Sequence, residues 1–117
     1  MAGVELDSGA VLGDVRRLCD APAASLVDVE RVLTDGYACV LQSEGERRRL
    51  RGRLQEQAVT TGAGSRVEVV EIRALAQGIA RADGEIEELR TALQTLAAKA
   101  SSLRRGLERQ ARPLRTA

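Results

Sequence analysis

Apolar residues repeat at alternating steps of three and four along the second half of the chain. The stretch GEIEELRTALQTL, residues 84–96, shows the spacing clearly. Because a helix turns once in about 3.6 residues, residues at these steps share one face. The repeat predicts one long helix that ends before Pro113. Its two interleaved seven-residue series are Ile72, Ile79, Ile86, Leu93, Ala100 and Leu107, and Leu75, Ala82, Leu89, Leu96, Leu103 and Gln110.

A second, less regular helical pattern precedes this one. Ser25 and Asp28 form a variant of the capping box, which predicts a helix start near Leu26. Gly36 in TDGYA is a candidate helix break, but the apolar pattern resumes in phase after it, which favours a continuous helix. The two series here are Leu26, Leu33, Val40, Arg47 and Leu54, and Val29, Gly36, Ser43, Leu50 and Gln57.

The stretch TTGAGS, residues 60–65, separates the two patterns and predicts a turn. A link of this length joins antiparallel neighbours, so we expect a helical hairpin. If the chain folds back about Gly62, the numbers of two facing residues add up to about 125. This register sets Leu33 beside Leu93. The same register predicts these opposite-charge contacts: Glu44 with Arg81, Asp35 with Arg90, Asp28 and Glu30 with Lys99, and Arg53 with Glu71.

Residues 1–24 form a separate N-terminal segment that contains a short amphipathic helix. Its apolar face is predicted to hold Val11, Leu12, Val15, Leu18 and Cys19, before Pro22 interrupts the helix. We expect this segment to continue in the direction of the second pattern, cover Leu103 and Leu107, and bring Asp20 to Arg104 or Arg105. The hairpin is predicted to span residues 25–112, and residues 113–117 to form a disordered tail.

The predicted fold is therefore all-α, a long antiparallel coiled-coil hairpin with a short N-terminal helix. A single hairpin leaves apolar residues uncovered, and small residues flank its seam at Ala76, Gly78, Ala92, Ala97 and Gly106. Small flanks suit a second close neighbour, so we expect two hairpins to form a four-helix bundle as a homodimer. The residues assigned to self-association are Val32, Tyr37, Leu41, Ile79, Ile86, Leu89, Leu93 and Leu96.

Composition narrows the functions that this fold would carry. Eighteen basic and 17 acidic side chains nearly cancel, so net charge favours no particular partner. The chain has no His, which removes the commonest general base and metal ligand. We therefore expect a non-enzymatic structural or adaptor protein, without a cofactor or metal, that binds copies of itself and another protein. The start MAGVELDSG has no export signal and no run is long enough to span a membrane, which predicts a cytoplasmic protein.

Two local features suggest other chemistry. The run ERRRLRGRL suggests a nucleic-acid surface, but on a helix its arginines radiate around the axis and no aromatic residue accompanies them. Nucleic-acid binding is therefore the alternative function, through Arg47, Arg48, Arg49, Arg51 and Arg53. Cys19 and Cys39 suit either a redox disulfide or simple packing, and packing is commoner for cytosolic thiols.

Overall fold

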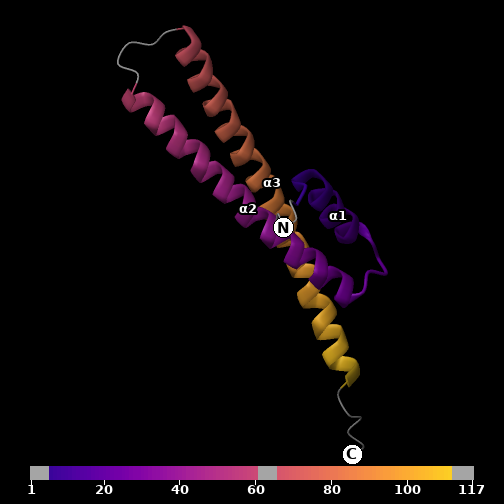
Figure 1. The fold of residues 1–117 in the computed structure, drawn as a ribbon. Helices are drawn as coiled ribbons and strands as arrows, with labels where there is room; N and C mark the ends of the chain where they lie inside the picture. The colour runs from indigo at the N-terminus through magenta and orange to yellow at the C-terminus, as the bar shows by residue number, and fades with distance from the viewer. Residues whose placement is uncertain (1–5, 61–65, 112–117) are drawn as a thin grey trace, which may run out of the picture.

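The computed structural model describes residues 6–60 and 66–111, which form three helices in an elongated molecule of 82 × 29 × 20 Å (Figure 1). The helices are α1 (Ser8–Asp20), α2 (Leu26–Thr60) and α3 (Arg66–Ala111). The two long helices pack against each other antiparallel, which confirms the predicted all-α hairpin. The predicted turn from residue 61 onward and the predicted tail lie outside the described residues. No helix in the described ranges is apolar over a length that would cross a bilayer.

Side-chain caps define where the first two helices begin. Asp7 accepts hydrogen bonds from the backbone N–H groups of Gly9 and Ala10, a cap that the sequence reading missed. The Ser25 hydroxyl accepts one from the N–H of Asp28 at 3.2 Å, and α2 begins at Leu26 as predicted. Only half of the capping box forms, because the Asp28 carboxylate binds Arg31 instead.

Gly36 lies in the middle of α2, which is one continuous helix as predicted. A Cβ atom built on Gly36 would lie 2.3 Å from Cδ2 of Leu93 and 3.2 Å from its Cγ. Glycine is therefore the residue that allows Leu93 to pack directly on the α2 backbone. The predicted seam is buried on both sides of this contact, at Val29, Leu33 and Val40.

The register of the hairpin differs from the prediction by about one helical turn. Leu93 packs beside Gly36, three residues beyond its expected neighbour Leu33. Gly78 likewise packs against Leu50. When one helix shifts by three residues along the other, each seven-residue series of α2 faces the other series of α3. The apolar seam therefore stays buried in either register. In the observed register, large side chains of one helix pack against glycines of the other. A count of apolar positions does not reveal this preference.

The predicted contacts between charged residues are wrong for the same reason. Glu44 binds Arg90 instead of Arg81, and Glu30 binds Arg104 at 3.0 Å instead of Lys99. The other predicted pairs, Asp35 with Arg90, Asp28 with Lys99 and Arg53 with Glu71, are also absent among the described contacts. Charges recur along both helices, and an exposed ion pair contributes only about 0–1 kcal/mol, so opposite charges match in several registers.

The position predicted for α1 is also wrong. Instead of continuing along α2, the chain reverses at residues 21–25, and α1 packs beside the middle of the hairpin (Figure 1). Ser8 at its start contacts Glu85, and Cys19 near its end contacts Ala92, so α1 runs parallel to α3 and antiparallel to α2. Asp20 consequently does not meet Arg104. A link of this length between helices already favours a reversal, by the rule that predicted the second turn.

Lys99 holds the end of α1 against α3. Its ammonium group donates hydrogen bonds to the carbonyl oxygens of Leu18, Cys19 and Ala21, the first at 2.5 Å and the second at 3.4 Å. The last carbonyls of a helix lack intrahelical partners and carry partial negative charge, so a cation stabilises them. The only lysine of the chain is thus a C-terminal cap supplied by another helix.

The hydrophobic core is concentrated where all three helices meet. The largest fully buried side chains are all in this part of the molecule: Val15, Val29, Cys39, Ile86, Leu89, Leu93 and Leu96. Toward the tip, only α2 and α3 remain in contact, and Ile72 and Ile79 are only partly buried. The molecule is therefore a three-helix core with a two-helix extension.

The contact at Gly36 predicts opposite effects for two glycine substitutions in α2. Gly36→Ala should lower the free energy of unfolding by about 1–3 kcal/mol, because the buried Leu93 has no space to move away. Gly52→Ala is the control: no atom lies within 4 Å of its new Cβ, so it should raise stability by about 0.5–1 kcal/mol. Urea unfolding followed by circular dichroism measures both, and stabilisation by both would show that Leu93 does not pack there.

Removing the charge that caps α1 should loosen that helix. We expect Lys99→Met to lower the free energy of unfolding by about 1–2 kcal/mol and to accelerate tryptic cleavage after Arg16 and Arg17. Arg105→Met is the matched control, since among the described residues the Arg105 guanidinium hydrogen-bonds only to the Ser102 hydroxyl of its own helix. Equal cleavage rates in the two variants would mean that Lys99 does not hold α1.

Candidate interaction surfaces

The residues assigned to self-association fall into two groups in the structure. Ile86, Leu89, Leu93 and Leu96 are fully buried, and Val32 packs against the same core. Ile79 is partly buried in the two-helix extension. Tyr37 and Leu41 alone are largely exposed, at 50% and 69%. Five of the eight are thus covered within one chain, because α1 occupies the place that the prediction gave to a second copy.

The small flanking residues of α3 are partly used inside the chain too. Ala92 and Ala97 are partly buried against the core, and the thiol of Cys19 donates to the carbonyl oxygen of Ala92 at 3.8 Å. Gly78 accommodates Leu50. These small residues therefore admit neighbours from the same chain, so they do not by themselves require a second hairpin.

An apolar surface remains without an intrachain cover along the outer face of α2. Val27, Tyr37 and Leu41 are exposed there, Val27 by 74%, and no sequence argument had singled out Val27. Its signal is the spacing Val27, Thr34, Leu41, which repeats every seven residues beside the seam. We define the outer face of α2 as Val27, Glu30, Thr34, Tyr37, Leu41, Glu44, Arg48 and Arg51.

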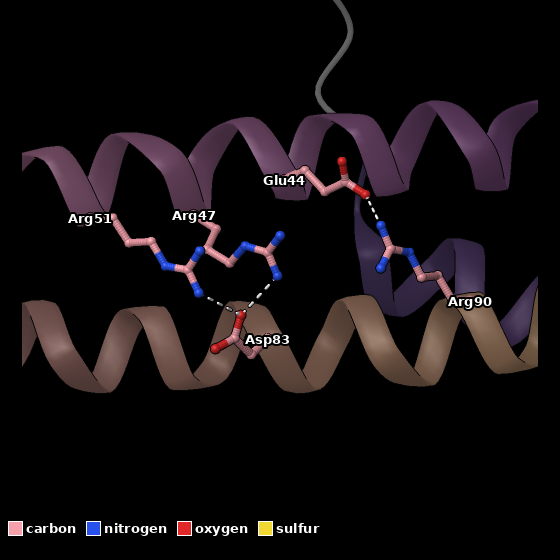
Figure 2. A network of polar contacts seen from close by, with 5 residues as sticks. All are labelled: Glu44, Arg47, Arg51, Asp83 and Arg90. Carbon is pink, nitrogen blue, oxygen red and sulfur yellow. Dashed lines mark hydrogen bonds and ion pairs between the residues drawn. The ribbon is translucent and has the colours of Figure 1, made fainter.

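The five arginines of the predicted polyanion surface do not act together. Figure 2 shows that Arg47 and Arg51 reach from α2 toward one carboxylate of α3, Asp83, at 2.9 and 3.8 Å. The Arg47 side chain is only 25% exposed. Two guanidinium groups around one carboxylate form a clamp between the long helices, and the carboxylate offsets one of the two positive charges.

The remaining arginines of the run differ in their contacts. Arg49 binds Glu46 on its own helix at 2.6 Å. Arg48 and Arg53 form no hydrogen bond or ion pair with the described residues. Two exposed, unpaired arginines are a smaller positive surface than the five that the sequence suggested, and this reduces the attraction for a nucleic-acid backbone.

Two of the acidic residues that follow Asp83 also have side-chain partners. Glu85 accepts a hydrogen bond from the Ser8 hydroxyl at 3.4 Å, and Glu88 lies 3.8 Å from Arg16. These contacts join α3 to α1. No group of three metal-ligating side chains occurs among the described residues.

A groove of about 440 Å³ runs between α1 and α3, lined by Arg16, Cys19, Asp20, Glu87, Glu88, Thr91, Ala92 and Thr95. Its hydroxyl groups are engaged by the helix itself. Thr91 donates to the carbonyl oxygen of Glu87 at 3.0 Å, and Thr95 donates to that of Thr91 at 3.4 Å. Both hydroxyl protons are thus bonded to backbone carbonyl oxygens and not to a side-chain base, as an activated nucleophile would be.

The two thiols are free and poorly suited to react. Burial raises the pKa of the Cys39 thiol, with further contributions from Glu85 and Asp7, while a hydrogen bond with Ser43 opposes the rise. Burial also raises the pKa of Cys19, and Asp20 adds to this while Lys99 counteracts it. The thiolate is the reactive form, so a raised pKa lowers reactivity at neutral pH.

The buried thiol of Cys39 predicts a loss of stability at alkaline pH. Its raised pKa means that the folded state favours the protonated form, so the stabilisation is complete below about pH 8.5 and is lost as pH rises through the folded-state pKa. Between about pH 8 and about pH 10, the free energy of unfolding should therefore decrease less for Cys39→Ala than for the unaltered chain. Urea titrations at the two pH values measure this, and equal falls would contradict it.

The structure thus leaves the outer face of α2 as an apolar surface without an intrachain partner among the described residues. Large apolar side chains are also exposed elsewhere, at Val59, Val69, Val70 and Leu107. Tyr37 and Leu41 lie at its centre, with charged residues on either side along the helix. Comparison of the chain with protein-family models, with curated proteins and with solved structures gave no match.

Proposed function

We propose that this chain is a non-enzymatic structural or adaptor protein, which self-associates through the outer face of α2 and binds another protein in that form. The exposure of Tyr37 and Leu41 carries the proposal. Tyrosine is enriched at the centres of protein interfaces, and Leu41 adds exposed apolar area beside it on the same helix face. Their location on a rigid helix, beside the buried core, supports a preformed binding surface.

The geometry of α2 supports an assembly of two hairpins. Consecutive residues of a helix point about 100° apart. Val40 is buried against α3, whereas Leu41, the next residue, is exposed. The outer face therefore lies about a quarter-turn from the seam. Two hairpins that meet along this face would place four long helices side by side, as in a four-helix bundle.

Nucleic-acid binding through the arginine run is the alternative function. Arg48 and Arg53 support it, since both are exposed and unpaired among the described residues. The clamp on Asp83 counts against it, because the Arg47 side chain is largely buried between the helices and Arg51 lies near the same carboxylate. Self-association is the better supported proposal.

Light scattering coupled to size exclusion tests the proposal. At micromolar concentration the mass should be twice that of one chain, and Leu41→Asp should give a folded monomer, because a charge at a closed interface would be buried without a partner. Leu107→Asp is the control. Leu107 is also exposed, at 51%, but it lies near the end of α3, so the dimer should persist.

Two results would count against this function. A monomeric mass for the unaltered chain over the whole micromolar range would remove self-association. A complex with generic duplex DNA that weakens steeply as salt rises, and that Leu41→Asp leaves intact, would favour the nucleic-acid alternative instead.

A further inference from the structure

We propose that a second copy of the chain packs antiparallel on the outer face of α2, with Leu41 of each copy against Tyr37 of the other, a geometry that rests on the proposed self-association. Both side chains are exposed and lie one helical turn apart. A two-fold axis perpendicular to α2 makes each contact occur twice, so the same two residues supply the whole apolar centre.

The outer face has the residue spacing of a helix–helix seam. Val27, Thr34, Leu41 and Arg48 follow one another at seven-residue steps, and Glu30, Tyr37, Glu44 and Arg51 form a second such series. The two series alternate at steps of three and four, like the core positions of a coiled coil. In an antiparallel pair, each member of one series meets a member of the other.

Contact between Leu41 and Tyr37 fixes every other pairing, because residues equally distant from position 39 then lie opposite each other. Arg48, nine residues after this position, meets Glu30, nine residues before it. Arg51 meets Val27, which its aliphatic stem can cover. No charge was used to choose this register, yet it joins opposite charges at both ends of the apolar centre.

Both members of this charge pair are available in the structure. Arg48 is exposed and forms no ion pair or hydrogen bond with the described residues. Arg104 binds Glu30 through a single carboxylate oxygen, Oε1, at 3.0 and 3.1 Å, so Oε2 is open to a second guanidinium. A carboxylate accepts from two guanidinium groups at once, as Asp83 does within the chain.

The reverse orientation is disfavoured by the same residues. A parallel pair in register would place Arg48 against Arg48 and Glu30 against Glu30 of the second copy, and like charges at a closed seam are repulsive. The region around the proposed axis also suits close approach, because Ala38 beside it has a small side chain. Charge therefore selects the orientation, while Tyr37 and Leu41 supply the apolar contact.

Charge exchange at positions 30 and 48 tests the geometry, with the dimer dissociation constant measured by analytical ultracentrifugation. Arg48→Glu and Glu30→Arg should each weaken the dimer by roughly tenfold or more, because each creates two like-charge contacts. An equimolar mixture of the two variants should form a heterodimer, and the double variant should dimerise more tightly than either single variant, even though Glu30→Arg also removes the intrachain contact with Arg104. Val59→Asp is the control, since Val59 is exposed on the same helix but lies beyond the proposed overlap.

The outcomes separate this geometry from the function on which it rests. A monomeric unaltered chain would overturn both. A dimeric chain whose affinity Arg48→Glu leaves unchanged, or that Val59→Asp dissociates, would overturn the antiparallel register and leave self-association standing. Because Arg48 forms no hydrogen bond or ion pair with the described residues, its variant should unfold like the original chain, and this check by circular dichroism keeps the result interpretable. Recovery in the double variant would support the proposed pairing of Arg48 with Glu30.

Discussion

Leu93 packs onto the α2 backbone at Gly36, and this contact sets the relative position of the two long helices. Any larger residue at position 36 would hold α3 further away. With the helices at this spacing, Glu44 reaches Arg90 and Asp83 lies between Arg47 and Arg51. The ion pairs follow from the register and add modestly to it, since most of these groups are partly solvated.

The position of α1 depends in turn on this seam. The middle of the hairpin presents Cys39 on α2 and Ala92 on α3. Val11 and Val15 of α1 join Cys39 in one buried core, and Cys19 of α1 contacts Ala92. Lys99 then closes the end of α1 by binding its last carbonyl oxygens. The short helix α1 thus adds a third wall to the seam between α2 and α3 and forms a three-helix core. This core extends only along the part of the hairpin that α1 contacts.

This arrangement also decides which surface is left for a partner. Cys39 and Leu41 are two residues apart on α2, and two residues correspond to about 200° of rotation. Covering Cys39 with α1 therefore leaves Leu41 facing away from the core, beside Tyr37. The same side of α2 holds the charged residues of the proposed interface, Arg48, which is exposed, and Glu30, which is partly exposed. The position of α1 on one side of α2 and the exposure of Leu41 on the other thus follow from the same helical rotation.

The sequence by itself determined the three helices, the start of α2 near Leu26, its continuity through Gly36 and the apolar stripe of α3, because these depend on local spacing and capping. It did not determine the register or the reversal of α1. A shift of one turn keeps the same stripe buried, and recurring charges match in either position. Only the tertiary structure decided these, because the fit of Leu93 on Gly36 and the capping of α1 by Lys99 join residues 57 or more positions apart.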